Sequence, residues 1–94
     1  MIEEFEWDEG NKEKNWKKHH VSVKECEEVF FNSPRIVWRD VKHSEKEERF
    51  IIFGKTNMGR GIHVAYVVRR GKVRVISARD QNKNERRFYA SQKN

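Results

Sequence analysis

The sequence has little of what exported and membrane proteins carry. Its single cysteine, Cys26, cannot form an internal disulfide, which is usual in a reducing cytosol. No apolar run approaches the roughly 18 residues of a membrane span. The first ten residues, MIEEFEWDEG, are acidic where a signal peptide is basic. We therefore expect a soluble, cytoplasmic protein with no membrane partner and with Cys26 as a buried structural thiol.

The sequence also lacks a pattern for metal binding. Its four histidines are not spaced at i, i+4 and do not pair with cysteines: His19, His20, His43 and His63. Zinc sites need such clusters of ligands. We expect the protein to work without a metal ion and without a cofactor.

Charge is abundant but unevenly distributed along the 94 residues. Residues 1–53 contain 10 Lys/Arg and 13 Asp/Glu, a net charge of −3, whereas residues 54–94 contain 11 Lys/Arg and 2 Asp/Glu, a net charge of +9. Such asymmetry favours a polyanionic partner, most often a nucleic acid. The alternative is a solvated basic surface without a partner.

Local patterns predict helices at the front of the chain and at its end. Asp8 is placed to cap a helix over 9–19, and Ser22 with Glu25 forms a capping box that opens a second helix. The second helix ends before Pro34, because the residue before a proline avoids the helical region. Asp80 or Asn82 caps a final helix that runs to about residue 91.

The remaining apolar runs predict antiparallel strands. Phe5 and Trp7 alternate with acidic residues, as in a short strand, and further strands are expected over 36–38, 48–55, 61–69 and 72–79. Arg70-Gly71 is a hairpin turn. Sequential strands with helices grouped in front predict a single α+β domain over residues 1–94, with the N-terminal helices packed on one face of the sheet.

Arginines are concentrated between Val73 and Tyr89. The guanidinium group is a planar fork of donors that matches phosphate geometry. Arg79 is the first choice for a phosphate ligand, because it ends a strand beside a helix N-terminus that also favours anions. Regular alternation places it on the face of Val73, Val75 and Ser77, with Arg74 on the opposite face. The alternative for Arg79 is an ion pair with Glu48 or Glu85.

Several motifs together resemble the BrnT-type toxins of type II toxin–antitoxin systems. FEWDEGN, KHHVSV, DVKHSEKEERF, VRVISAR and ERRFY occur in the order and spacing found in that family, from Phe5 to Tyr89. The family usually has glycine where this chain has His20, and its relatives are mostly polar around 36–38. The resemblance implies a RelE-like fold, RNA cleavage, and neutralisation by a BrnA-like ribbon-helix-helix antitoxin. DNA is then bound only by the toxin–antitoxin complex.

RNA cleavage without a metal needs a base for the 2′-hydroxyl, an acid for the 5′-oxygen, and cations near phosphorus. HSEKEERF offers His43 as base or acid, with Glu48 and its neighbours Glu45 and Glu47 as alternatives; a solvated loop is the other interpretation. The predicted catalytic set is Arg79, His43, Glu48 and Tyr89. The predicted RNA-binding set is Arg74, Arg86, Arg87, Lys55 and Lys18. At most one of Arg86 and Arg87 faces the site, and for Tyr89 a core position with its hydroxyl at the edge is slightly favoured over a role in RNA contact.

Two other functions are compatible with this composition. A nucleic-acid-binding module without catalysis would use the same basic half to hold the phosphate backbone. An interaction protein would use it to bind an acidic antitoxin segment. Only the family resemblance favours the enzyme.

Overall fold

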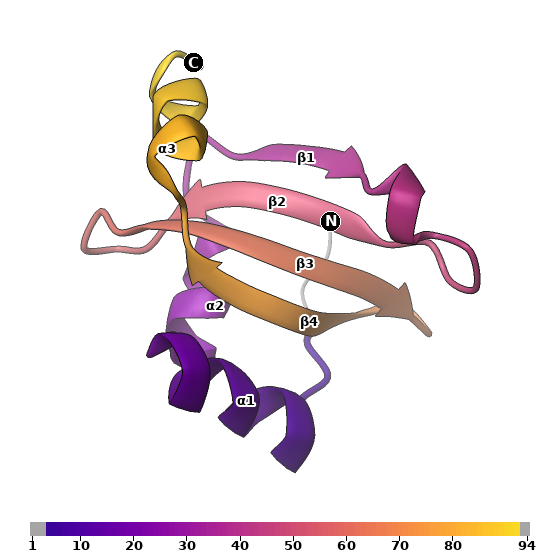
Figure 1. Cartoon of the computed structure of the whole chain (residues 1–94). Coiled ribbons are helices and arrows are strands. Elements are labelled where there is room, and N and C mark those ends of the chain that lie inside the picture. The colour runs from indigo at the N-terminus through magenta and orange to yellow at the C-terminus, as the bar shows by residue number, and fades with distance from the viewer. Residues whose placement is uncertain (1–3, 93–94) are drawn as a thin grey trace.

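The computed structural model describes residues 4–92. Its elements are α1 (Glu9–His19), α2 (Val23–Val29), β1 (Ile36–Arg39), the 3-10 turn η1 (Val41–His43), β2 (Phe50–Lys55), β3 (Gly61–Arg69), β4 (Lys72–Asp80) and α3 (Lys83–Ala90). The four strands form one antiparallel sheet in the order β1-β2-β3-β4 (Figure 1). The predicted α+β class is confirmed.

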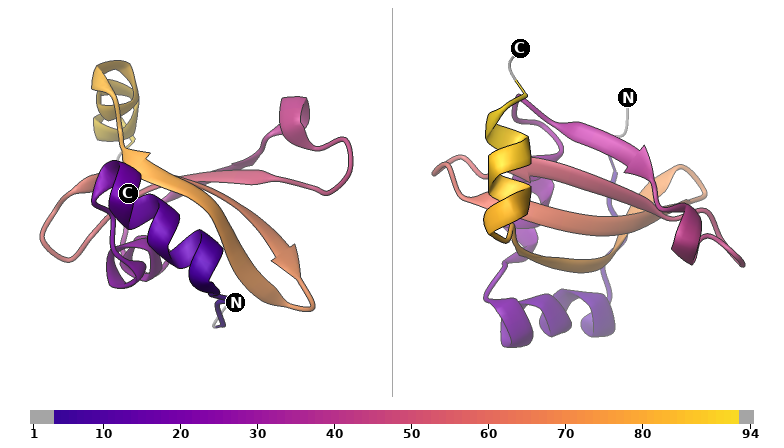
Figure 2. Two further views of the ribbon diagram at one scale, coloured as in Figure 1. Left: turned by 60° about the horizontal axis from the view of Figure 1, so that its bottom comes forward. Right: turned by 45° about the horizontal axis from the view of Figure 1, so that its top comes forward.

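Helices lie on both faces of the sheet. α1 packs on β4 and α2 packs on β2 and β3, so one face, the α1/α2 face, is covered as predicted. α3 stands on the opposite face, the α3 face, where Tyr89 packs against Ile51, Phe53 and Ala65. Figure 2 shows α3 and η1 rising from the sheet at opposite ends, on the side away from α1 and α2.

The helix boundaries follow from capping side chains. Asp8, Ser22 and Asn82 each accept a hydrogen bond from the backbone N–H three residues later, and each cap is a reciprocal capping box. Such caps satisfy donors that a helix N-terminus otherwise leaves free. α1 ends at His20, which has φ 54° in the left-handed region and stands where the resembling family has glycine. Histidine is among the side chains that tolerate this region.

The main core lies between the sheet and the first two helices. Its fully buried side chains include Val21, Cys26, Val29, Ile52, Ile62, Val64, Val73, Val75 and Ala78. Burying one such valine or isoleucine stabilises the fold by about 1.5–3 kcal/mol. Burial also raises the pKa of the Cys26 thiol to about 12, so this cysteine is a structural group as predicted.

A β-bulge in β4 decides which way its arginines point. Ala65 pairs with Ser77 and the next residue, Tyr66, pairs with Val75, so Ile76 is an extra residue that shifts the alternation of side chains. Val73, Val75 and Ala78 are buried in the main core. The prediction that Arg79 shares the face of Val73 and Val75 is wrong, because the bulge turns Arg79, together with Ser77, to the α3 face.

The outer edge of β4 is covered by the N-terminal part of the chain. The side chains of Asn11, Lys14 and Asn15 bond the backbone of Val75, Ile76 and Ala78. The strand predicted around Phe5 is reduced to a single parallel bridge with Val73. These contacts leave β1 as the sheet edge without a covering segment among residues 4–92.

Candidate functional site

Arg79 lies in a closed cluster beneath the first turn of α3. Its Nη1 donates to Glu85 Oε1 at 2.8 Å and its Nη2 donates to Glu85 Oε2 at 3.0 Å. His63, directly opposite Arg79 in the sheet, has its Nδ1 3.0 Å from Arg79 Nη2 and 3.1 Å from Glu85 Oε2. The charges of Arg79 and Glu85 therefore neutralise each other, and the three side chains join α3 to β3 and β4.

The protonation of this cluster follows from its contacts. The hydrogen bond from Arg79 lowers the pKa of Glu85 to about 2. Burial, and then the charge of Arg79, lower the pKa of His63. One Nδ1 cannot both accept from Arg79 and donate to Glu85; a neutral ring with its proton on Nε2 accepts from Arg79 and agrees with the lowered pKa. Arg79 therefore forms the ion pair with Glu85 that is the alternative, expected from the sequence, to a phosphate ligand.

A pocket of about 320 Å³ lies at the other end of the α3 face. It is lined by Lys42, His43, Glu45, Lys46, Glu47, Arg49, Val67 and Ile76. At its rim His43 Nδ1 lies 2.9 Å from Asp40 Oδ2. An ionised carboxylate only accepts hydrogen bonds, so in the neutral form of the ring Nδ1 carries the proton and Nε2 carries the lone pair. The His43 side chain is 54% exposed.

Local hydrogen bonds fold the loop that forms this pocket. Asp40 N–H donates to the Arg49 carbonyl at 2.7 Å. The Ser44 hydroxyl donates to the Asp40 carbonyl at 2.6 Å and accepts from the Arg49 N–H at 3.0 Å. The 3-10 turn between them brings Asp40 and His43 to the same side, since positions i and i+3 eclipse in that geometry.

The charges of the pocket are unequally paired. Glu47 binds Arg69 through two hydrogen bonds of 2.7 and 2.9 Å, and these lower the pKa of Glu47. Lys42 and Lys46 form no ion pair within residues 4–92. Arg49 Nε is buried and has no hydrogen-bond partner in the same range. A buried donor of this kind calls for a ligand or a water.

The predicted catalytic residues do not come together in one site. Arg79 ends β4 just before α3 and Tyr89 belongs to α3, whereas His43 belongs to η1 and Glu48 to the loop after it. Figure 1 shows α3 and η1 at opposite ends of the sheet. Glu48 pairs with Arg39 at 3.2 Å. The Tyr89 hydroxyl donates to the Pro34 carbonyl at 2.6 Å, and burial raises its pKa.

The predicted RNA-binding arginines Arg74 and Arg86 are engaged within the protein. Arg74 donates to Asp8 at 2.7 Å and lies 3.5 Å from Glu6, so it ties the N-terminal segment to the edge of β4. Arg86 donates to the Gln81 carbonyl at 2.8 Å. Both guanidinium groups thus have structural contacts.

The other three predicted RNA-binding residues lie on separate surfaces. Arg87 is exposed on α3, and Lys55 ends β2. Lys18 lies on α1, which covers the opposite face of the sheet. The structure therefore does not join this set into one surface around the pocket.

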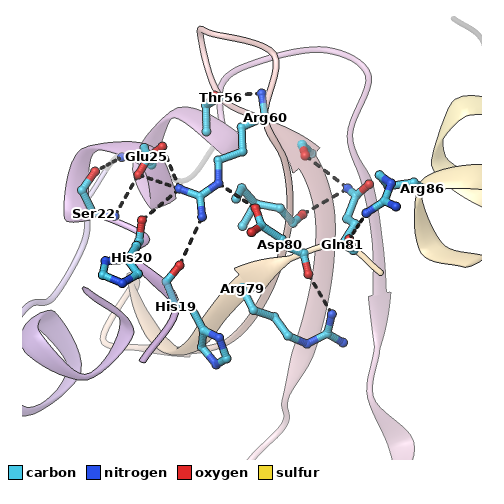
Figure 3. Close-up of polar contacts among 12 residues, drawn as sticks. His19, His20, Ser22, Glu25, Thr56, Arg60, Arg79, Asp80, Gln81 and Arg86 are labelled. Atoms are coloured by element: carbon cyan, nitrogen blue, oxygen red, sulfur yellow. Dashed lines mark hydrogen bonds and ion pairs between the residues drawn. The ribbon is translucent and has the colours of Figure 1, made fainter. Parts of the chain in front are cut away.

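Sequence reasoning missed two residues. Asp40 orients His43 through the 2.9 Å contact. The three-residue spacing between them in the sequence could have predicted this contact. Arg60 joins distant elements through bonds to Asp80 (2.6 Å), Glu25 (3.1 Å) and the carbonyls of His20 and His19 (2.9 and 3.2 Å), as Figure 3 shows. No local pattern marks Arg60, because its partners are 20 to 41 residues away.

Residues 4–92 contain no group of three or more His, Cys, Asp or Glu side chains arranged to hold a metal ion. None of the helices in that range has the length and apolar character needed to cross a membrane.

The fold and the pocket define a small basic α+β protein with an Asp–His pair beside several cations. Residues 7–85 match the sequence model of a family described as the ribonuclease toxin BrnT of type II toxin–antitoxin systems. The chain belongs to this family, and the resemblance seen in its motifs is confirmed. A search among curated proteins finds no match.

Proposed function

We propose that the protein is an endoribonuclease toxin that cleaves RNA at the pocket beside η1 without a metal ion. Its family consists of ribonuclease toxins. The observation that carries the site is the 2.9 Å contact between Asp40 and His43, at the rim of a pocket that Lys42, Lys46 and Arg49 also line. Ribonucleolytic chemistry needs a positioned base and nearby cations, and this pocket has both.

In this mechanism His43 acts first. Its Nε2 takes the proton of a ribose 2′-hydroxyl, and that oxygen attacks the adjacent phosphorus. The bond from phosphorus to the 5′-oxygen breaks, which leaves a 2′,3′-cyclic phosphate and a 5′-hydroxyl end. Arg49 stabilises the charge that develops on phosphorus. The leaving oxygen takes its proton from the ammonium group of Lys42 or Lys46.

The other predicted catalytic residues have supporting roles in this proposal. Arg79 holds Glu85 and thereby the first turn of α3. Tyr89 holds the last turns of α3 against Pro34. Glu48 pairs with Arg39 and does not line the pocket; it is not the base, because Asp40 already orients a better-placed His43.

The antitoxin is part of the same proposal. Membership of a toxin–antitoxin family implies a neutralising partner. We propose that this partner is a BrnA-like ribbon-helix-helix protein, that DNA is bound only through the complex, and that the toxin has a RelE-like domain and acts in the cytoplasm. A reading frame for such a protein beside the gene supports this; its absence argues against it.

Incubation of the purified protein with total RNA, with and without EDTA, tests the activity. We expect cleavage under both conditions and loss of cleavage in His43→Ala. RNA that stays intact with and without EDTA indicates a second candidate function, a nucleic-acid-binding module without catalysis. The positive charge of the basic half of the chain favours that candidate. Cleavage only without EDTA contradicts the metal-independent mechanism.

A further inference from the structure

Two exposed aromatic side chains pack against one buried ring on the α3 face. Trp38 on β1 and Phe88 on α3 are 40% and 48% exposed, yet both contact the buried ring of Phe53. Trp38 lies edge-on to Phe53 with ring centroids 4.7 Å apart, and Phe88 lies edge-on at 6.3 Å. The bond from Tyr89 to Pro34 holds α3 beside the start of β1. We call Trp38, Phe53 and Phe88 the aromatic platform.

The aromatic platform adjoins the cationic pocket. Trp38 pairs with Ile51 in the sheet, and Arg49 precedes Ile51 by two residues on the same face. Two residues of a strand span about 7 Å. A molecule that contacts Trp38 therefore needs to extend only about 7 Å along the sheet to reach Arg49 and the pocket.

Arginines are the sequence neighbours of both ends of the aromatic platform, and further cations line the adjoining pocket. Arg35 precedes β1 and Arg87 precedes Phe88; both are exposed, and neither forms an ion pair within residues 4–92. Lys42, Lys46 and Arg49 line the adjoining pocket, together with Glu45 and with Glu47, which is already paired with Arg69. Aromatic groups among cations suit a ligand that is flat, apolar on its faces and attached to phosphates.

We infer that Trp38 and Phe88 stack on an unpaired base of the RNA substrate while the neighbouring phosphate lies in the pocket. This inference rests on the proposed function and adds that the substrate is single-stranded at the cut site. Bases of a duplex are already stacked on their neighbours and cannot lie on a protein ring. Stacking tolerates any base, so the aromatic platform selects unpaired RNA more than a sequence.

Binding of uncleavable RNA tests the inference on the wild-type protein. Fluorescence anisotropy compares a 2′-O-methyl single strand, an abasic strand of equal length and charge, and a duplex. We expect the abasic strand to bind roughly 5- to 150-fold more weakly than the single strand, the range expected for one stacked base. We expect the duplex to bind more weakly as well. Equal affinity for all three RNAs overturns the inference.

Matched variants locate the effect. Trp38→Ala and Phe88→Ala should each weaken binding of the single strand and remove most of its advantage over the abasic strand. Trp16→Ala and Phe31→Ala are controls of similar exposure, 53% and 52%, on the side of α1 and α2, and should bind as wild type does. If a variant does not fold, the affinities of the wild-type protein for the three RNAs still test the inference.

Two further results separate this inference from the proposed function. If the wild-type protein prefers the single strand over the abasic strand but does not cut RNA, the nuclease proposal is wrong and base stacking on the aromatic platform is supported. If the protein cuts RNA without any such preference, base stacking is wrong and the nuclease proposal is supported. If Trp38→Ala and Phe88→Ala bind RNA normally but lose the antitoxin, the surface belongs to a protein partner and the inference is wrong.

Discussion

The two ends of the α3 face carry the same kinds of residue in different states. One end has His63, Glu85 and Arg79, and the other has His43, Asp40 and Arg49. At the first end the three groups bind one another, and His63 is only 17% exposed. At the second, His43 is 54% exposed and Arg49 keeps a buried donor without a partner among residues 4–92. The same residue types therefore form a candidate binding site only where their donors and lone pairs are not already used within the protein.

The closed end resists a ligand for an energetic reason. A phosphate that bound Arg79 would displace Glu85 and leave that carboxylate partly buried without its cation. Losing one partner of a buried ion pair is strongly destabilising. The open end has no such penalty, because Lys42, Lys46 and Arg49 form no ion pair with a carboxylate among residues 4–92.

The largest expected effect is the loss of catalysis at the open end. His43→Ala should lower the rate of RNA cleavage by about 10²- to 10⁴-fold, the usual contribution of a general base. The melting temperature should hardly change, because the ring is exposed. His63→Ala is the matched control, and it should keep cleavage within a few-fold of wild type while melting earlier. The reverse pattern would move the catalytic site to the closed end.

Next in size is the loss of stability at the closed end. Arg79→Ala should lower the free energy of unfolding by about 1–2 kcal/mol, less than for a fully buried pair because the Arg79 side chain is 35% exposed. Arg49→Ala should instead weaken RNA binding and cleavage. Urea unfolding and cleavage rates measure both. If Arg79→Ala remains stable but no longer cleaves RNA, Arg79 is the phosphate ligand that the sequence suggested.

Acid should weaken the closed end through Glu85 and His63. The pKa of Glu85 is lowered from 4.5 to about 2, so its stabilisation is complete above pH 4.5 and is lost as pH falls toward 2. The lowered pKa of His63 acts in the same direction, from about pH 6.5 downward, because the unfolded chain takes up the proton more readily. Glu85→Gln should flatten the fall of unfolding free energy below pH 4.5. Parallel curves for variant and wild type would contradict this.

The smallest expected effect concerns salt. RNA affinity should fall as salt rises, since phosphate contacts release counterions, and each single-strand contact contributes about 0.7 to the slope of log K against log salt. Lys42→Ala and Lys46→Ala should each reduce the slope by about that amount. Lys18→Ala should leave it unchanged, because α1 lies on the other face. A reduced slope in Lys18→Ala would show that RNA also contacts α1.

Much of the fold could be predicted because its signals are local. Ser22 with Glu25 gave the start of α2, and the bounds of β3 follow from a run of nine residues between glycine and a hairpin turn. The direction of Arg79 could not be predicted in the same way. One extra residue at Ile76 reverses the faces of all later positions in β4, and no residue type in VRVISAR marks that bulge.

The candidate site was predictable only in part. The HSEKEERF segment supplied His43, and the basic half supplied the expectation of a phosphate ligand. Asp40 was missed although it lies three residues from His43. The separation of His43 from Arg79 was also missed, because it depends on the register of β2 against β3 and β4.

The sequence by itself determined the family, the α+β class, the helix caps and the basic character of the chain, because each depends on neighbouring residues or on composition. Only the tertiary structure decided which charges remain available. Arg79 and Arg49 are chemically identical, and strand pairing places one against Glu85 and the other beside an open pocket. A side chain's availability depends on the partners that folding brings to it, and those partners come from distant parts of the chain.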